Sequence, residues 1–286
     1  MKVAITAASG KLGTEIVEAT AALLSNENVI GLARSPEKAK HLNIEIRPGN
    51  YNDKEVLVSS LQSVDVVLLV SGIDVPDKRI EQHRNVIQAA KENGVRKIVY
   101  TSIQGAEENT AFSPIVQSNR QTEQDIRNSE MDWVIGRNGI YIEPDIEYVD
   151  VYEEKGGIVN CAGSGKCGYT TRPELAYAYA RMITDDEHNG RTYNLHGEAI
   201  TQRQLAEYLN YAFGTTLTYT STSVEEFRQD RIDELGEFLG SIIAGIYQGI
   251  REGAFDNPSH YAEAAGKGHA SWQEFFDAIK ANESSV

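Results

Sequence analysis

Residues 6–14 read Thr6-Ala7-Ala8-Ser9-Gly10-Lys11-Leu12-Gly13-Thr14, and this stretch decides the fold of the chain. It follows a short apolar run and opens an amphipathic stretch at residues 13–24. A glycine-rich loop between a buried strand and a helix is typical of a dinucleotide-binding βαβ unit. Gly10 lets the backbone approach a pyrophosphate, which the free N–H groups of the following helix stabilise. Gly13 lets that helix pack closely on the sheet.

Beyond this loop, short runs rich in Val and Ile alternate with amphipathic stretches, which predicts repeated βαβ units around a parallel sheet. The predicted strands are residues 3–6, 29–32, 44–46, 64–70, 97–101 and 133–135. The predicted helices are residues 13–24, 54–61, 79–93 and 114–128, and Asn93-Gly94 suits the C-cap of the third. Residues 1–141 are therefore expected to form an α/β domain, a doubly wound parallel Rossmann sheet that binds NAD(P).

After residue 141 the βαβ pattern is lost. Helices are predicted at residues 174–183, 201–213, 224–235, 239–249 and 272–280, with short strands at 192–195 and 217–220. We expect a smaller mixed α/β lobe over residues 142–286 that binds substrate, and part of the Rossmann sheet can return from this lobe. The segment Gly163-Ser164-Gly165-Lys166 does not meet the phosphate-loop pattern and is interpreted as a turn.

Composition excludes several classes of protein. The formal net charge of −15 and the pI near 4.9 disfavour binding to nucleic acid or to anionic membranes. No apolar run approaches the roughly 20 residues of a membrane span, and no export signal is visible, so a cytoplasmic location is expected. Cys161 and Cys167 are interpreted as free thiols, and neither they nor the six histidines have the spacing of a metal site.

The residues after the second predicted strand indicate which dinucleotide binds. An acidic side chain there would bind a ribose 2′-hydroxyl, whereas a cation accommodates the 2′-phosphate of NADP. The sequence has no Asp or Glu at the strand end but has Arg34, with Lys38 one helical turn further on. Arg34 can pair with phosphate oxygens, so NADPH is the predicted cofactor and NADH remains possible.

Short-chain dehydrogenases and sugar epimerases use a Tyr with a Lys four residues later to move a proton. No lysine of this chain has a tyrosine four residues before it. The sequence therefore favours hydride transfer to an acceptor that needs little acid or base help, such as a quinone or another conjugated, electron-poor compound.

Several segments together resemble the NmrA-like group of atypical short-chain dehydrogenase relatives, and within it the bacterial NAD(P)H:quinone oxidoreductase type 2 and triphenylmethane reductase members. The likeness spans nearly the whole chain. The matching segments are residues 6–13, 33–39, 82–87, 89–91, 94–95, 100–102, 137–141, 162–166 and 171–172.

The resemblance implies roles for particular residues. Around the cofactor it places Gly10, Lys11, Leu12 and Gly13 at the pyrophosphate, with Thr6, Ala8 and Ser9 as further cofactor-binding residues of the same loop. It places Arg34 and Lys38 at the 2′-phosphate, and Ser71 and Gly72 at the adenosine. Thr101, Ser102, Ile103 and Asn138 would surround the nicotinamide, and Asn138 and Tyr141 are the candidate catalytic residues, beside Gly139. The implied partner is a small-molecule acceptor such as a quinone, bound by a monomer or a homodimer.

The chain departs from the family pattern at two positions. Ala7 stands where the family usually has the first glycine of its loop, and its β-carbon is expected to tighten the turn or crowd the phosphates. Asn50 stands where the family commonly has Asp, which changes the contacts near the adenine. Ala7 and the missing Tyr/Lys pair together leave open an alternative function, a redox-sensing regulator that binds NADP(H) without turnover. Sugar epimerisation is a third, for which no replacement of the Tyr/Lys pair is found.

Overall fold

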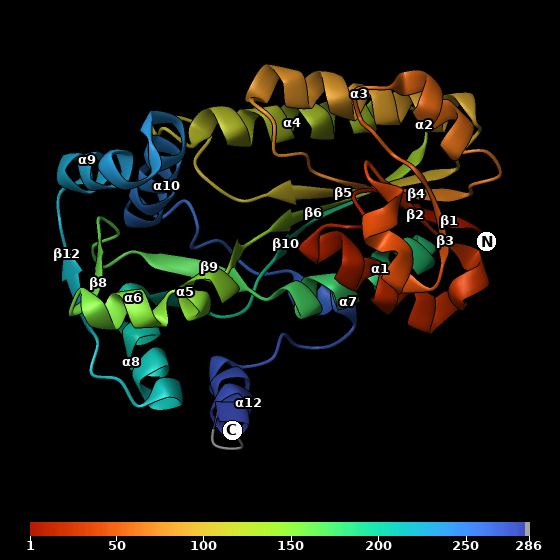
Figure 1. Ribbon diagram of the computed structural model, residues 1–286. Coiled ribbons are helices and arrows are strands. Elements are labelled where there is room, and N and C mark those ends of the chain that lie inside the picture. Colours follow the sequence, from red (N-terminus) through yellow and green to blue (C-terminus); the bar gives the residue numbers. More distant parts are fainter. Residues whose placement is uncertain (284–286) are drawn as a thin grey trace.

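The computed structural model describes residues 1–283 and is built on a seven-stranded, fully parallel sheet with helices on both faces (Figure 1). Its strand order is β10-β6-β5-β4-β1-β2-β3. The strands are β1 (Val3–Ile5), β2 (Val29–Ala33), β3 (Glu45–Pro48), β4 (Val66–Val70), β5 (Lys97–Ile103), β6 (Asp132–Asn138) and β10 (Arg191–Leu195). The order reverses direction between β1 and β4, which opens a crevice at their carboxyl ends. The predicted Rossmann fold is confirmed.

Two helical layers cover this sheet because its strands are apolar on both faces. One layer holds α2 (Lys54–Ser60), α3 (Pro76–Glu92) and α4 (Ser113–Arg127), and the other holds α1 (Lys11–Leu24), α7 (Arg172–Thr184) and α11 (Tyr261–Ala265). Along β4, Val67 and Leu69 belong to the core under α2 to α4, whereas Val66 and Leu68 face α1 and α7. Burial on both faces explains why these strands read as unbroken apolar runs.

The chain re-enters the large sheet after residue 141. The strand predicted at 192–195 is β10, which pairs in parallel with the edge of β6. The helix predicted at 174–183 is α7, which packs on α1. The large sheet is thus completed by residues that follow the first six strands by more than 50 positions.

The remaining elements form a smaller lobe with its own apolar core around Tyr169, Leu205, Trp272 and Phe276. Its strands form a three-stranded and a two-stranded sheet: β7 (Ile140–Tyr141), β8 (Gly157–Asn160), β9 (Lys166–Thr170), β11 (Ala199–Thr201) and β12 (Thr218–Ser221). Its helices are α5 (Glu143–Glu147), α6 (Val149–Glu154), α8 (Gln202–Phe213), α9 (Val224–Leu235), α10 (Glu237–Arg251) and α12 (Trp272–Glu283). Sequence patterns missed β7, β8, β9, β11, α5, α6 and α11, because two to six residues are too few to show a period.

The glycine-rich segment of the small lobe is a turn, as predicted. Gly163 has a positive φ of 63°, and the Gly165 N–H donates to the Ala162 carbonyl at 3.0 Å. The neighbouring Cys161 and Cys167 are buried free thiols, which confirms their interpretation.

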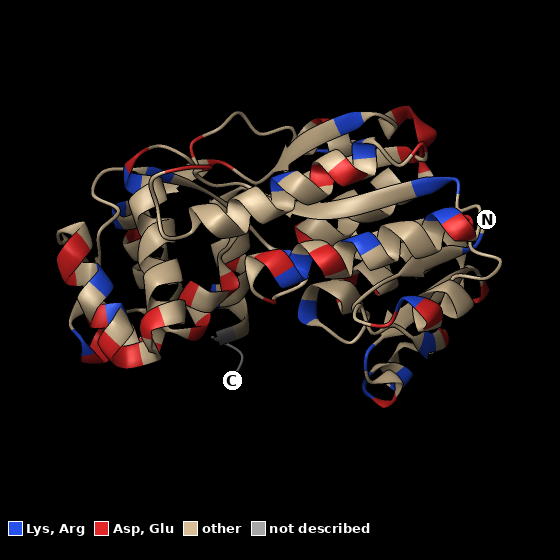
Figure 2. Ribbon diagram, turned by 90° about the horizontal axis from the view of Figure 1, so that it is seen from above, with Lys and Arg blue, Asp and Glu red and all other residues tan. Residues whose placement is uncertain are grey.

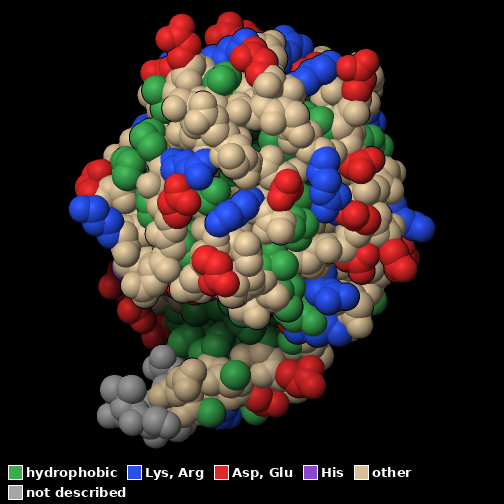
Figure 3. All heavy atoms as spheres, turned by 90° about the vertical axis from the view of Figure 1, so that its right-hand side faces the viewer, with side chains coloured by type: hydrophobic (Ala, Val, Ile, Leu, Met, Phe, Trp, Pro, Cys, Tyr) green, Lys and Arg blue, Asp and Glu red, His purple; other side chains and the backbone are tan. Residues whose placement is uncertain are grey.

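On the face that Figure 3 shows, charged side chains of both signs are interspersed. Acidic residues are more concentrated on the small-lobe helices α5, α6 and α9 (Figure 2). Within residues 1–283, no helix has the length and apolar character needed to cross a membrane. The same residues contain no group of three or more side chains placed to ligate a metal ion.

Candidate functional site

The loop between β1 and α1 has the geometry of a phosphate cradle. Gly10 is extended and precedes the helix without a capping side chain, so the first N–H groups of α1 have no partner within the helix. A β-carbon on Gly13 would lie 2.2 Å from the Ala7 carbonyl oxygen, so only glycine allows α1 to approach the loop this closely. Ala7 itself has a φ of 49°, in the left-handed region that favours glycine. These features fit a bound pyrophosphate.

Thr6 and Ala8 support this loop from below rather than lining a cavity. Both are fully buried. The Thr6 hydroxyl oxygen accepts a hydrogen bond from the Val70 N–H at 2.9 Å and contacts the Tyr51 hydroxyl, while the Ala8 N–H donates to the Leu32 carbonyl at 3.0 Å. Thr6 therefore ties the loop to β4 through its side chain and its backbone N–H, and the Ala8 backbone ties the loop to β2.

A cavity of about 470 Å³ runs from the loop along the carboxyl ends of β1, β2 and β4. Its lining includes the predicted residues Ser9, Gly10, Lys11, Leu12, Gly13, Arg34, Lys38, Ser71 and Gly72, together with Ala7, Ser35, Asn50, Tyr51, Asn52, Asp74 and Gln82. The structure therefore brings most of the predicted cofactor residues together on one cavity.

Arg34 and Lys38 stand at one end of this first cavity. Both side chains are exposed, and neither makes a hydrogen bond or ion pair with another residue in the described chain. Lys11 differs, because its ammonium group pairs with Glu147 of α5 at 3.0 Å. Arg34 and Lys38 are thus available to an anion, as binding of a 2′-phosphate requires. Asn50 lines the same cavity.

A second cavity of about 370 Å³ adjoins the first and shares Leu12, Val70, Ser71 and Gly72 with it. It contains the other predicted residues, Thr101, Ser102, Ile103, Asn138 and Tyr141. Its remaining lining is Arg79, Phe112, Ile115, Asn119, Gly139, Ile140, Pro144 and Ile246. Together the cavities form one elongated site, polar at the Arg34 end and largely apolar at the Tyr141 end.

Backbone groups where the two cavities meet are held by buried side chains. The Ser71 N–H donates to the Thr101 hydroxyl oxygen at 2.8 Å, and the Gly72 N–H donates to His83 Nε2 at 2.9 Å. Burial, reinforced by the nearby charge of Arg79, lowers the pKa of His83 to about 3. A neutral imidazole is therefore present near pH 7, which leaves Nε2 free to accept the Gly72 hydrogen bond.

The two candidate catalytic residues lie side by side at the far end of the second cavity. Asn138 is 5% exposed, and its Oδ1 accepts a hydrogen bond from the Tyr179 hydroxyl at 2.6 Å. The Arg172 guanidinium stacks over the Tyr141 ring at 5.4 Å. Burial raises the pKa of Tyr141, an effect that the Asn138 amide partly offsets. Tyr141 thus holds its proton at neutral pH, so its hydroxyl group is able to donate a hydrogen bond.

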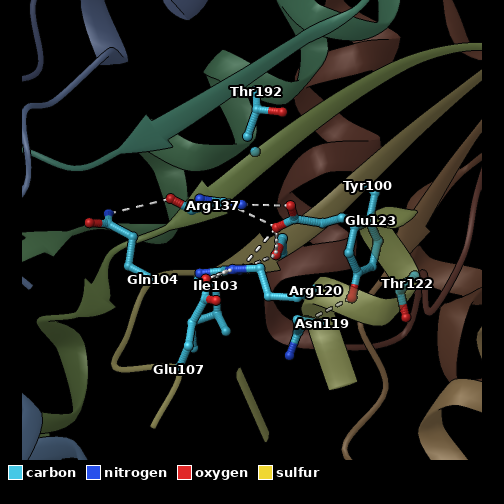
Figure 4. A network of polar contacts seen from close by, with 12 residues as sticks. Tyr100, Ile103, Gln104, Glu107, Asn119, Arg120, Thr122, Glu123, Arg137 and Thr192 are labelled. Carbon is cyan, nitrogen blue, oxygen red and sulfur yellow. Dashed lines mark hydrogen bonds and ion pairs between the residues drawn. The ribbon is translucent and has the colours of Figure 1, made fainter. Parts of the chain in front are cut away.

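A buried charge network supports the floor of this cavity (Figure 4). Glu123 of α4 is fully buried and accepts hydrogen bonds from the Ser102 hydroxyl at 2.7 Å and from Arg137 at 2.9 and 2.7 Å. Arg120 and Arg127 also pair with it, at 2.9 and 3.1 Å. Burial alone would raise the pKa of Glu123, but the Arg137 and Arg120 guanidinium groups hold it below its ordinary value. The network fixes β5, β6 and α4 relative to one another.

Sequence reasoning missed Arg79, Phe112, Ile115, Asn119 and Ile246 as lining residues. They come from α3, α4 with its N-cap residue Phe112, and α10, and which helical face meets the cavity depends on tertiary packing. Sequence reasoning also assigned no role to His83, which accepts a hydrogen bond from the Gly72 N–H. Its only signal was its place in the family-like segment at residues 82–87.

A third cavity, of about 520 Å³, lies in the small lobe on the other side of α10. Tyr148, Tyr152, Phe227 and Tyr247 line it. None of the predicted site residues contributes to it.

Comparisons with known proteins agree with this geometry. The model of an NAD(P)H-binding family matches residues 7–186. Quinone oxidoreductase 2 of Escherichia coli (strain K12) is 35% identical over 229 residues, which cover 79% of each chain. A crystal structure of that organism's NADPH-dependent quinone oxidoreductase, complexed with NADPH, superposes with a TM-score of 0.89 and 31% identity, covering 97% of this chain and 99% of the other.

A second solved structure has the same degree of similarity. The triphenylmethane reductase of Citrobacter sp., complexed with NADP(H), has a TM-score of 0.89 and 30% identity, covering 98% of this chain and all of the other. The family match spans more than half of the chain and includes the phosphate cradle, Arg34 and Asn138. The chain therefore belongs to the NAD(P)H-binding family and is an oxidoreductase.

Proposed function

We propose that this chain is an NADPH-dependent reductase that passes hydride to a quinone or a similar conjugated acceptor. The observation that supports this best is the pair of adjoining cavities, one with a phosphate cradle and unpaired cations, the other largely apolar. The two similar proteins are named for a quinone and for triphenylmethane, which are compounds built on conjugated or aromatic rings. A largely apolar cavity suits such a molecule.

In this proposal each part of the site binds one part of the reactants. Backbone groups of Gly10, Lys11, Leu12 and Gly13 bind the pyrophosphate, Arg34 and Lys38 the 2′-phosphate, and Ser71 and Gly72 the adenosine. Thr101, Ser102, Ile103 and Asn138 surround the nicotinamide, with Asn138 and Tyr141 against the acceptor. Bound NADPH supplies the hydride. Holding both reactants in one elongated site is the main contribution of the protein.

Little acid or base chemistry is required of the protein. The Ser102 hydroxyl already donates to Glu123, so it does not protonate a substrate. The raised pKa of Tyr141 lets it donate a hydrogen bond to an acceptor oxygen while keeping its proton. The acceptor then takes its proton from water, as reduced quinones do readily.

The test is NADPH oxidation by the purified protein, followed by the loss of its near-ultraviolet absorbance, with and without a panel of quinones. Arg34→Ala should weaken NADPH binding about 10- to 100-fold and leave NADH binding unchanged, because only NADPH has the phosphate that Arg34 meets. Lys40→Ala is the matched control, since Lys40 is an exposed cation of the same segment that does not line the cavity.

Rapid oxidation that depends on the acceptor supports the reductase. Tight NADPH binding without turnover of any quinone would contradict it and favour the alternative, a redox-sensing regulator.

A further inference from the structure

Arg79 is the residue of the second cavity that the proposed function leaves without a role. It lies in the first turn of α3, is 6% exposed, and lines the second cavity but not the first. Asp74 and Tyr100 are near enough for their charges to affect the pKa of Arg79, but neither forms an ion pair with it. A charged side chain this deeply buried normally has a partner.

No such partner is found among residues 1–283. The guanidinium makes no hydrogen bond or ion pair, and its Nε is buried without any partner atom. Asp74, the nearby carboxylate, instead accepts a hydrogen bond from Gln82 at 2.6 Å. By contrast, the other largely buried guanidinium groups near the site are paired: Arg120 and Arg137 with Glu123, and Arg172 with Glu143.

An unpaired guanidinium in this position is unfavourable for the ligand-free protein. Burial lowers the pKa of Arg79, yet arginine keeps its proton in proteins, so the charge persists. An anion with hydrogen-bonding oxygens that enters the cavity would offset the cost of removing that charge from water. Neighbouring His83 is neutral and cannot supply the negative charge.

Two anions could occupy this position, a cofactor phosphate or an acidic group of the acceptor. The phosphate cradle and Arg34 line the first cavity, which Arg79 does not reach. Arg79 shares its cavity with Phe112, Ile115 and Ile246, the apolar residues that suit a flat acceptor. Its placement therefore favours the acceptor.

We propose that Arg79 forms an anion subsite in the acceptor cavity, so that the preferred acceptor is a planar conjugated carbonyl compound carrying a carboxylate, sulfonate or ionised enol. This inference rests on the proposed function. The acceptor gains the hydride of NADPH and one proton from water, becoming the two-electron-reduced hydroxy compound, while the cofactor leaves as NADP⁺. Arg79 stays protonated throughout and holds the acidic substituent.

The first test measures binding without any reaction. Naphthalene-2-sulfonate is flat and anionic but cannot accept hydride, so it is titrated calorimetrically against the NADP⁺-bound protein. Arg79→Met should weaken its binding about 10- to 100-fold, the usual effect of losing a charge-assisted pair. Arg79→Lys should restore part of the affinity, because it keeps the charge but loses the planar fork. Arg84→Gln is the matched control, from an exposed arginine of the same helix.

The second test compares two quinones that differ only in charge. The kcat/KM ratio of 1,4-naphthoquinone-2-sulfonate to 1,4-naphthoquinone should exceed one for the unaltered protein and fall about 10- to 100-fold in Arg79→Met. NADPH affinity should stay within about threefold. The unfolding temperature of ligand-free Arg79→Met should be equal or higher, since an unpaired buried charge is removed.

The outcomes separate the subsite from the proposed function. Equal binding of naphthalene-2-sulfonate to the unaltered protein and to Arg79→Met would overturn the subsite, whatever the protein reduces. A matching loss of NADPH affinity would also overturn it and assign Arg79 to the cofactor. If no quinone is turned over, the proposed function fails, while selective loss of sulfonate binding still supports the anion subsite.

Discussion

At the scale of single residues, the β1–α1 loop depends on Gly13. Gly13→Ala places a β-carbon 2.2 Å from the Ala7 carbonyl oxygen and 2.8 Å from its carbon. We expect NADPH binding to weaken at least about 10-fold, because α1 must move away from the loop that holds the phosphates. Fluorescence titration with NADPH measures this change. Gly268→Ala is the control, since a β-carbon there meets nothing within 4 Å, and an equal loss in that variant would contradict the argument.

Replacing the neighbouring residues Ala7 and Ala8 by glycine should change the stability of the protein in opposite directions. Ala7 has a φ of 49° whereas Ala8 does not have a positive φ. Ala7→Gly relieves a left-handed conformation that costs about 1 kcal/mol, so thermal unfolding should occur at an equal or higher temperature. Ala8→Gly should lower stability by about 1 kcal/mol or more, because it adds freedom to the unfolded chain and removes a fully buried methyl group. A loss of stability in both variants would show that Ala7 is not strained.

Residues whose role depends on the local chain could be predicted from the sequence. Gly10, Gly13 and Arg34 follow directly from a strand, a loop and a second strand end. Arg79 and His83 could not, because their roles arise only when α3 packs beside the loop after β4. The spacing of residues in the sequence does not indicate that α3 contacts this loop.

At the scale of elements, Glu123 is where α4, β5 and β6 are joined. Glu123→Gln leaves Arg120, Arg127 and Arg137 without their shared carboxylate, and should lower the free energy of unfolding by about 3–5 kcal/mol. Denaturant unfolding measures this. Glu107→Gln removes an exposed carboxylate from the same Arg120 and should cost less than about 1 kcal/mol.

The same carboxylate predicts a pH dependence. The pKa of Glu123 is lower in the folded protein than its ordinary value, so its stabilising effect is complete above about pH 4.3. It is lost as the pH falls through the folded-state pKa, because the unfolded chain binds the proton first. The stability difference between the unaltered protein and Glu123→Gln should therefore shrink in acid. A constant difference would contradict this assignment.

At the scale of the whole molecule, buried histidines should make the protein sensitive to acid. Burial lowers the pKa of His83 to about 3, and it also lowers the pKa of His188, His196 and His269. An unfolded histidine titrates near pH 6.5, so between these values the unfolded chain binds protons that the folded protein excludes. Stability should fall as the pH falls below about 6.5, by up to about 1.4 kcal/mol per pH unit for His83 alone.

His83→Gln should flatten this slope, whereas His41→Gln, at an exposed position, should not. Unfolding temperatures between neutral and mildly acidic pH measure both. Parallel profiles for His83→Gln and the unaltered protein would show that the acid sensitivity has another origin.

The large sheet was more predictable than the small lobe. Strands buried on both faces are continuous apolar runs, and all six predicted strands are present. In the small lobe, β7 has two residues and β11 has three, and their burial depends on distant helices such as α12. The site was therefore predictable at the end formed by β1, β2 and the loop, and less so where α3, α4 and α10 close it.

The return of β10 to the large sheet has a consequence for how the protein is made. During synthesis, β6 emerges with one side unpaired, and α1 emerges before α7, the helix that packs on it. Until residue 195 has left the ribosome, the nascent chain presents an open strand edge and an uncovered apolar helix face. Such surfaces recruit chaperones or associate with other chains. The cofactor-binding half therefore cannot finish folding when the ribosome has made its first six strands. It finishes only after α7 and β10 have been synthesised.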